Sequence, residues 1–473
     1  MQQQTLSTLA QWTGGYVYGD DLCIAQISRD SRQPMQQALY IALRGERFDG
    51  HAFVEDAVRH GAVAVLVDHY LTNIHVAQIV VDDTTLALGQ IARVIQHNSA
   101  HCVFAITGSN GKTTVKMLLH AVLQQYVGIE KHVVYANPGN YNNEIGLPLS
   151  VVDAPEHLRF AIYEMGAGKP GDIAYLCQIV PPKIALVNTI APAHLARMHN
   201  LLGIAKTKGA IYQSLDNDGI AVINADNAFG PWFCSTCVPQ GCQIISFSLH
   251  ASSDVRASQV RLRSFGAQFM LCTPWGQRHV CLPLAGIHNI YNALAATTMA
   301  LAAGVALDAI VEALENVSPI QGRQHTHVLP NGVTVIDDSY NANIGSVYAA
   351  IDVLAQCPQG WLVLGDMHEL GERSNAFHSQ VGARARDAGV ARLYTLGPSS
   401  ALAASAFGKN AYALTQVGAY AELLEVICAD LNDIQARSEK GSLTILVKGS
   451  RASGMEHIVN SLLKKQGGET DAV

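Results

Sequence analysis

Short apolar runs alternate with stretches of helical periodicity along most of the chain. Between residues 103 and 119 the sequence VFAITGSNGKTTVKMLL places a β-favouring run, two glycines and Lys-Thr-Thr before apolar residues at helical spacing. The later runs FAIYEMG, KIALVNTI and GIAVINAD also alternate with helical segments. This order predicts an α/β protein whose central sheet is mainly parallel and doubly wound.

The pattern changes along the chain, and the changes predict three domains. Residues 1–84 mix short apolar runs with the polar stretch 44–51, as in a small α/β domain with one exposed loop. Residues 85–317 form the central domain, and alternating strands near 248–283 indicate an antiparallel extension of its sheet. Residues 318–473 start a fresh series of apolar strands that end in Gly, Asp, Ser or Asn, which predicts a Rossmann-like α/β domain.

The turn Gly108-x-x-Gly111-Lys112-Thr113 indicates a loop that binds phosphate. Its backbone N–H groups and the following helix N-terminus would converge on one point, which suits a phosphate chain. Lys112 would reach the outer phosphates, and the Thr113 hydroxyl would ligate Mg²⁺. Ile106 stands where the usual motif has its first glycine, so the loop is a shorter variant. A tight turn with an incidental lysine is the alternative, but the flanking strand and helix favour a nucleoside triphosphate site.

Other polar residues follow predicted strands of the central domain. Glu164 ends the strand FAIYE, where its carboxylate would be a second oxygen ligand for Mg²⁺, although a helix cap or surface acid is an equal alternative. The stretch 137–146 holds four asparagines, as a binding loop or a simple turn would. His194 follows KIALVNTI, and a lone histidine is more often structural. By default, Lys206 and Lys208 belong to a solvated helix face.

Composition narrows the class of protein. A chain of 473 residues with 49% hydrophobic and 15% charged residues fits a multidomain soluble protein without a membrane span. The net charge of −7 gives no general attraction to nucleic acid. The N-terminus lacks a secretory signal, so we expect a cytoplasmic location. Cys234, Cys237 and Cys242 could bind a metal or react with oxidants, but without a second pair at zinc-ribbon spacing they are better interpreted as reduced thiols.

A series of motifs resembles one family over the whole chain. The stretches occur in the order TGSNGKTT, NYNNEIGLP, YEMGAG, AHL, KTKG, GIHNIYNALAA, QGR, DDSYNAN, LGDMHELGE and VKGSR. Together they resemble the ATP-dependent Mur ligases of peptidoglycan synthesis, of the type that adds D-alanyl-D-alanine. The resemblance implies an ADP-forming ligase that joins D-alanyl-D-alanine to UDP-N-acetylmuramoyl-tripeptide through an acyl phosphate, with ATP and Mg²⁺, and we expect a monomer.

The same resemblance assigns roles to individual residues. It implies that the nucleotide is held by Gly108, Ser109, Asn110, Gly111, Lys112, Thr113, Thr114, Asn289, Asn292, Arg323, Asp338, Tyr340 and Asn341. It places at the magnesium ions Thr113, Glu164, His194 and Lys208, the last as a carbamate formed with CO₂. It gives catalytic roles to Lys112, His194, Lys208 and Arg323. The substrate contacts that it implies are Ser31, Arg32, Arg44, Gly45, Asp49, Gly50 and His51 for the UDP-sugar, and Asn140, Asn142 and Asn143.

The sequence departs from the family pattern in two places and leaves two rivals. Ile344 replaces a proline after DDSYNAN, and Ala210 replaces an acidic residue after Lys208. A folylpolyglutamate synthetase-like ligase would share the phosphate loop, but DDSYNAN and LGDMHELGE argue against it. A nucleotide-switched binding protein without ligase activity would need the phosphate loop alone. No Asp-Asn-Pro-Arg sequence, which the diaminopimelate-adding relatives use, is present, and its absence favours the type that adds D-alanyl-D-alanine. The sequence leaves open whether the tripeptide ends in meso-diaminopimelate or lysine.

Overall fold

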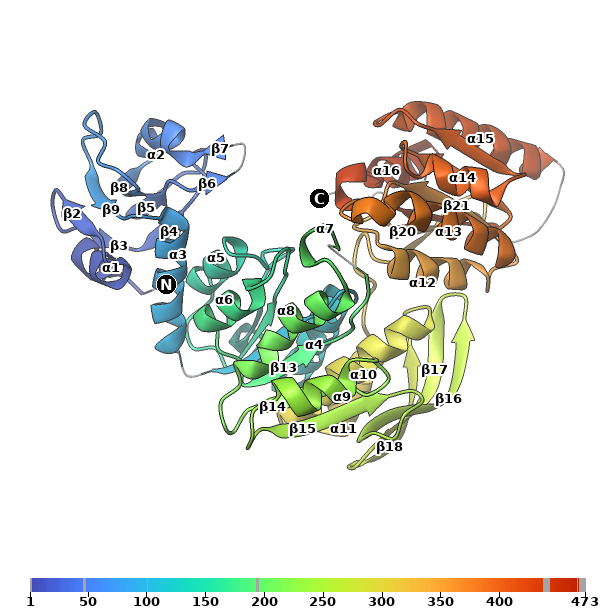
Figure 1. Cartoon of the computed structure of the whole chain (residues 1–473), viewed down its shortest axis with the longest axis horizontal. Helices are drawn as coiled ribbons and strands as arrows, with labels where there is room; N and C mark the ends of the chain where they lie inside the picture. The colour runs from blue at the N-terminus through green and yellow to red at the C-terminus, as the bar shows by residue number, and fades with distance from the viewer. Residues whose placement is uncertain are drawn as a thin grey trace.

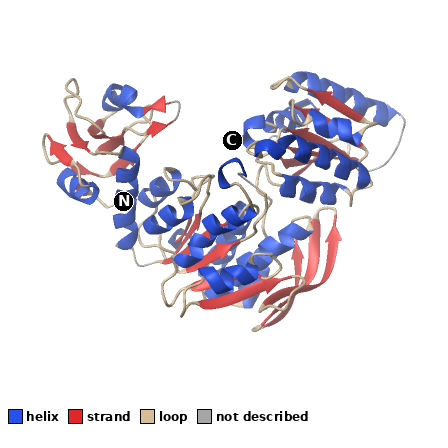
Figure 2. Cartoon of the chain, in the orientation of Figure 1, coloured by secondary structure: helices blue, strands red, loops and turns tan. Residues whose placement is uncertain are grey.

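Three large sheets, each covered by helices, follow one another along the chain (Figure 1). The computed structural model describes residues 2–45, 48–99, 101–192, 195–436, 443–465 and 467. Figure 2 shows that helices flank the strands in all three parts. Within the described residues, no helix combines the length and the apolar character needed to cross a lipid bilayer.

The first sheet has the strand order β2-β9-β8-β5-β4, and only β2 is antiparallel to its neighbour. Its strands are β2 (Tyr16–Tyr18), β4 (Gln26–Ser28), β5 (Ala38–Ile41), β8 (Ala62–Val67) and β9 (Ala77–Val80). Two short ribbons pair β1 (Gln4–Thr5) with β3 (Cys23–Ile24), and β6 (Arg44–Gly45) with β7 (Phe48–Asp49). Because α1 (Leu6–Thr13) and α3 (Thr84–His97) cover one face and α2 (Val54–Arg59) the other, β8 is almost entirely buried.

Helix α3 joins the first sheet to the central one. Its apolar side belongs to a hydrophobic cluster that runs from α1 into α5 (Gly146–Val152) and α6 (Asp172–Ile179) of the central part. The boundary predicted at residue 84 falls at the start of α3, and the boundary predicted at 317 falls just after α11 (Leu307–Glu315). Because α3 packs on both parts, the structure does not separate them sharply at residue 84. Both boundaries stay predictions.

The central sheet has nine strands in the order β11-β12-β10-β13-β14-β15-β16-β17-β18. It is parallel from β11 to β16 and antiparallel from β16 to β18, which confirms the expected extension. Its strands are β10 (Cys102–Thr107), β11 (Val134–Ala136), β12 (Phe160–Glu164), β13 (Ile184–Val187), β14 (Ile220–Asn224), β15 (Gln243–Ser248), β16 (Val255–Arg263), β17 (Gly266–Thr273) and β18 (Gly276–Leu282).

Helices cover both faces of the central sheet. One face packs against α4 (Lys112–Val127), α10 (Ile287–Ala302) and α11. The other packs against α5, α6 and α8 (Leu201–Gln213). Shorter helical pieces are η2 (Lys131–Val133), α7 (Leu195–Met198), α9 (Gly230–Trp232) and η3 (Phe233–Cys237).

The third sheet has the order β19-β20-β24-β21-β22-β23 and is parallel except for β19. Its strands are β19 (His325–Val328), β20 (Thr334–Asp338), β21 (Gln359–Gly365), β22 (Arg392–Leu396), β23 (Ala411–Leu414) and β24 (Leu443–Lys448). One face packs against α12 (Ile344–Leu354), α13 (Ser374–Asp387) and α14 (Ala401–Phe407). The other packs against α15 (Tyr420–Ala436) and α16 (Glu456–Lys465), so the expected α/β architecture is confirmed. The 3₁₀ turns η4 (Gly371–Arg373) and η5 (Arg451–Ser453) complete it.

Candidate active site

The phosphate loop lies between the end of β10 and the start of α4, as the sequence predicts. Gly108 and Gly111 have φ angles of 150° and 78°, a region that L side chains rarely adopt. A Cβ at Gly111 would lie 2.2 Å from Asn292 Oδ1 and 2.3 Å from Asn188 Nδ2. The glycine therefore lets α4 begin directly against two amide side chains.

Glu164 and Thr113 meet at the carboxyl ends of the neighbouring strands β12 and β10. The Thr113 hydroxyl donates to Glu164 Oε2 at 2.9 Å, and Asn142 Nδ2 donates to Oε1 at 2.8 Å. Burial alone would raise the pKa of Glu164, but the charges of Lys112 and Lys116 outweigh it and hold that pKa below its usual value. The carboxylate is thus ionised and aimed at the phosphate loop, as a ligand of a divalent cation must be.

Lys112 folds back over its own loop. Its Nζ donates to the Gly108 carbonyl oxygen at 2.9 Å. Burial lowers the pKa of Lys112, while the nearby Glu164 carboxylate acts in the opposite direction. The lysine therefore sits among the groups that the sequence predicts around the outer phosphates.

Lys116 is part of this site, and the sequence reasoning missed it. The side chain is only 2% exposed, and its Nζ donates to the carbonyl oxygens of Asn137 at 2.8 Å and Gly139 at 3.0 Å. It also lies 3.5 Å from Glu164 Oε2. Asn137 Oδ1 in turn accepts from the Glu164 backbone N–H at 2.8 Å. The sequence did contain one indication of a buried lysine, because Lys116 lies one helical turn after Lys112 and interrupts an apolar helix face.

The third domain reaches the phosphate loop through two side chains. Arg323 donates from its guanidinium to Thr113 Oγ1 at 3.0 Å and lies 4.3 Å from the centre of the Tyr340 ring. Asn343 Nδ2 donates to Asn110 Oδ1 at 2.6 Å. Arg323 thus extends from the third domain to the phosphate loop, and its contact with the terminal phosphate stays a prediction; the Asn343 contact was not predicted.

Asp338 and Asn341 share a cation at the end of β20. Lys448 Nζ donates to Asp338 Oδ2 at 2.5 Å and to the Asn341 carbonyl oxygen at 3.1 Å. Burial raises the pKa of Asp338, and the Lys448 charge opposes that rise. Lys448 was quoted within the VKGSR stretch but was given no role, because a single lysine at a strand end has no distinctive spacing.

Asparagines at the start of α10 form a connected amide chain. Asn292 Oδ1 accepts from Asn188 Nδ2 at 2.9 Å, and Asn292 Nδ2 donates to Asn289 Oδ1 at 3.1 Å. Asn289 Nδ2 donates to Gln324 Oε1 at 3.2 Å. Asn188 Oδ1 is buried without a hydrogen-bond partner among the described residues, so a ligand N–H group would satisfy it.

The phosphate loop, the asparagines of α10 and the polar residues at the ends of β20 and β24 line one cavity of about 650 Å³ between the central and third domains, whereas Glu164, Lys116 and Tyr340 are not among its lining residues. A volume of this order accommodates a nucleotide. Its walls include the phosphate loop, Asn188, Asn289, Asn292, Arg323, Asp338, Asn341 and Lys448. None of the described residues of the first domain is among them.

Lys208 is buried on α8, so its default assignment to a solvated helix face is wrong. It is 2% exposed, whereas Lys206 on the same helix is exposed. Burial and then the Lys112 charge lower the pKa of Lys208 well below its usual value. Among the described residues no hydrogen bond or ion pair of Lys208 is found. His194, the remaining candidate metal ligand, lies outside the described residues.

The first-domain candidates form a separate group. Arg44 Nε lies 3.4 Å from Asp49 Oδ2, and His51 Nδ1 lies 2.6 Å from Asp49 Oδ1. Gly50 is buried against Leu43. Elsewhere in the domain, Ser31 is buried, and the exposed Arg32 pairs with Asp30 at 2.8 Å. Gly45 is exposed on β6.

Two further candidate groups have local roles. Asn143 Oδ1 accepts from the Gly146 N–H at 2.9 Å at the start of α5, and Asn140 is exposed. The cysteines 234, 237 and 242 are free, and burial raises the pKa of each thiol. In the part of the chain that the structure describes, they form no group suited to a metal ion.

Three family models match the chain in succession. They are "Mur ligase family, catalytic domain" at residues 24–96, "Mur ligase middle domain" at 106–300 and "Mur ligase, glutamate ligase domain" at 322–451. The chain belongs to the Mur ligase family. The resemblance found in the sequence is thereby confirmed, and the phosphate loop, Glu164 and Asn289 of this Mur ligase lie within the middle-domain match.

Curated relatives share nearly the whole length of this Mur ligase. The UDP-N-acetylmuramoyl-tripeptide--D-alanyl-D-alanine ligase of Escherichia coli (strain K12) is 39% identical over 97% of the chain and 98% of the relative. The protein of the same name from Bacillus subtilis (strain 168) is 32% identical over 98% of the chain and 99% of the relative.

Solved structures of MurF proteins match this chain over nearly its whole length. MurF from Acinetobacter baumannii superposes with a TM-score of 0.90 at 33% identity, covering 98% of this chain and 99% of that one. MurF ligase from Thermotoga maritima, in complex with ADP, gives a TM-score of 0.80 at 27% identity, covering 93% and 98%. A Mycobacterium tuberculosis folylpolyglutamate synthase has a TM-score of 0.64 at 16% identity, covering 79% and 94%, a likeness of fold alone.

Proposed function

We propose that this Mur ligase joins D-alanyl-D-alanine to UDP-N-acetylmuramoyl-tripeptide in the cytoplasm, with conversion of ATP to ADP and phosphate. The observation that carries the proposal is the convergence of Glu164 from the central domain and Arg323 from the third domain on the Thr113 hydroxyl, next to the phosphate-loop lysine Lys112. The names of the full-length relatives support the choice of substrates.

The residues around the cavity fit a nucleoside triphosphate. The backbone N–H groups of residues 111–113, at the N-terminus of α4, would supply donors for phosphate oxygens, and no side chain at Gly111 blocks them. The unpartnered Asn188 Oδ1 offers one acceptor to the ligand. Asn289 and Asn292 are proposed to contact the adenine, because amides match its donor and acceptor edge.

The donor set also fits magnesium. Thr113 and Glu164 would hold the ion, and we propose Lys208, as a carbamate, and His194 as further ligands. When bound, Mg²⁺ would neutralise charge on the phosphate oxygens.

In the proposed reaction the terminal carboxylate of the tripeptide attacks the γ-phosphorus of ATP, and ADP leaves. The amine of D-alanyl-D-alanine then attacks the acyl phosphate, and phosphate leaves with formation of the peptide bond. Lys112 and Arg323 would stabilise the charge on the transferred phosphoryl group, because both reach the phosphate loop. Tyr340 would hold the guanidinium plane of Arg323 by stacking.

The products test this assignment. We expect ATP turnover only when both the UDP-sugar tripeptide and the dipeptide are present, and we expect ADP and phosphate as products. Mass spectrometry of mixtures with each tripeptide, ending in meso-diaminopimelate or in lysine, will also identify the third amino acid. Formation of AMP and pyrophosphate would contradict the proposal, and nucleotide binding without amine-dependent turnover would indicate a binding protein.

The first domain is proposed to hold the UDP-sugar away from the cavity. Replacing Arg44 by alanine should mainly raise the KM for the nucleotide sugar, because contacts to a remote UDP group act equally on the ground and transition states. The KM for ATP should stay unchanged, since none of the first-domain residues that the structure describes lines the cavity. Steady-state kinetics with each substrate varied in turn will decide, and a change confined to the KM for ATP would refute this assignment.

A further inference from the structure

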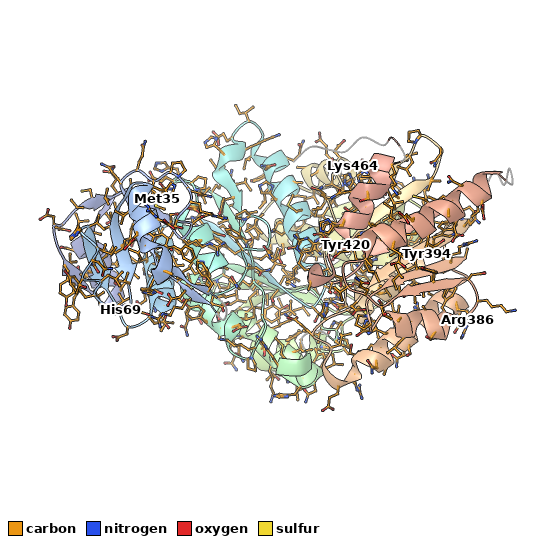
Figure 3. The ribbon with its side chains drawn as sticks, turned by 90° about the horizontal axis from the view of Figure 1, so that it is seen from above. Met35, His69, Arg386, Tyr394, Tyr420 and Lys464 are labelled. Atoms are coloured by element: carbon orange, nitrogen blue, oxygen red, sulfur yellow. The ribbon has the colours of Figure 1, made fainter. Side chains whose placement is uncertain are left out.

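Two histidines and a carboxylate converge beside the loop of residues 44–51 in the first domain. His51 lies on η1 (Gly50–Phe53), and Asp68 and His69 directly follow β8. One ligand atom from each of the three lies within 4.8 Å of the others. Figure 3 labels His69 on the first domain. We propose that His51, Asp68 and His69 bind a divalent transition-metal ion such as Zn²⁺ or Co²⁺.

Both histidines lie close to the same carboxylate oxygen of Asp68. His69 Nδ1 lies 2.5 Å and His51 Nε2 lies 3.2 Å from Asp68 Oδ1. The two imidazole rings stack, with centres 5.1 Å apart and planes inclined by 22°. Small rotations of the side chains would let all three atoms contact one ion, and three protein ligands leave a position open to water, as in many zinc sites.

The surrounding hydrogen bonds orient His51 as a ligand. Its Nδ1 is paired with Asp49 Oδ1 at 2.6 Å, and its Nε2 accepts from the Asp68 backbone N–H at 3.1 Å. These partners assign the ring proton to Nδ1 and direct the Nε2 lone pair at the Asp68 backbone N–H, so a metal ion on Nε2 would replace this hydrogen bond. A carboxylate behind a histidine ligand is the usual arrangement at metal centres. The side chain of His51 is also only 7% exposed and already held in place, so metal binding would cost little side-chain conformational entropy.

The net charge of the cluster and the chemical type of its ligand atoms indicate which metal ion it would bind. With neutral imidazoles, Asp49 and Asp68 carry two negative charges against the single positive charge of Arg44. Arg44 holds both oxygens of Asp68, with its Nε 2.9 Å from Oδ2 and its Nη2 donating to Oδ1 at 3.3 Å, so a metal ion on Oδ1 would displace the second of these contacts. Two nitrogen ligands and one oxygen suit Zn²⁺, Co²⁺ or Ni²⁺, whereas Mg²⁺ prefers oxygen ligands.

Titration of the full-length protein with Co²⁺, followed by visible absorption and calorimetry, tests the site. His69→Ala should weaken binding at this site by ~10-fold or more, since even changes behind a metal ligand cost that much. His75→Ala is the matched control, because His75 is an exposed histidine of the same domain outside the cluster. Zn²⁺ should also raise the thermal midpoint of the wild-type protein more than that of His69→Ala, because binding would link η1 to the end of β8.

A ligand exchange makes the test specific. His69→Cys should restore Co²⁺ binding and add a near-ultraviolet thiolate-to-cobalt band, measured as a difference from the wild type because the chain already has ten cysteines. Equal Co²⁺ affinity in the wild type and His69→Ala would overturn the proposal. Absence of saturable binding by the wild type would also overturn it and would leave the cluster as a proton-sharing network.

Discussion

Replacing Lys208 by alanine is expected to abolish most of the ligase activity, by a factor of ~10²–10³, the typical cost of one preorganised electrostatic contact. The side chain is buried without a partner among the described residues, and an ammonium group there would repel both Lys112 and a magnesium ion. A carbamate formed with CO₂ would turn it into an anionic oxygen ligand. Its lowered pKa favours the neutral amine that must react with CO₂.

Chemical rescue separates this role from simple packing. Acetate or formate should partly restore turnover of Lys208→Ala, because a small carboxylate can occupy the space of the carbamate. Lys206→Ala is the matched control and should keep its activity, since Lys206 is exposed on the same helix. Initial rates with and without added carboxylate provide the measurement. Full activity of Lys208→Ala without any acid would eliminate the carbamate.

Replacing Lys116 by methionine should lower kcat by ~10–100-fold, because hydrogen bonds to a charged group are worth ~1.5–3 kcal/mol. Lys116 holds the carbonyl oxygens of Asn137 and Gly139 and lies beside Glu164. Without its charge, the asparagine-rich loop loses its attachment to α4, and the Glu164 carboxylate loses one of the cations that keep it ionised and in place. The Mg²⁺ concentration required for half-maximal rate should rise as well.

The Mg²⁺ dependence distinguishes a positioning role from a general loss of stability. Lys131→Met removes an exposed lysine and should change neither kcat nor the Mg²⁺ requirement. Thermal unfolding of both variants should be recorded together with the kinetics. If Lys116→Met lowered the unfolding midpoint while kcat and the Mg²⁺ requirement stayed normal, Lys116 would be a structural residue only.

The sequence predicted the elements around the phosphate loop well because their signals are local. Strand β10, the glycine turn and α4 follow from periodicity and from two glycines with positive φ. The antiparallel extension could be predicted for the same reason, since alternation along β16, β17 and β18 is visible in each strand. The doubly wound order of the central sheet follows from strands that alternate with helices.

Burial of charged groups could not be predicted in the same way. Lys116 and Lys208 lie on amphipathic helices where a lysine normally faces water, and only the packing of α4 and α8 against other elements encloses them. The contact of Asn343 with Asn110 joins residues that are 233 positions apart. The resemblance to a family supplied Arg323 and Lys208, whereas their residue types alone gave no such indication.

Under the proposed function, the contact between Arg323 and Thr113 would have to be exchanged for contacts with the nucleotide and its metal ion. The Thr113 hydroxyl already donates to Glu164 and accepts from Arg323, so a metal ion that binds this oxygen competes with the guanidinium. Under the proposed function, the arriving phosphate chain releases Arg323 from the hydroxyl and gives it a new anionic partner. When ADP departs, the guanidinium can return to Thr113, and this intramolecular rebinding would hasten product release. Arg323 would thus act both in phosphoryl transfer and in the release of ADP.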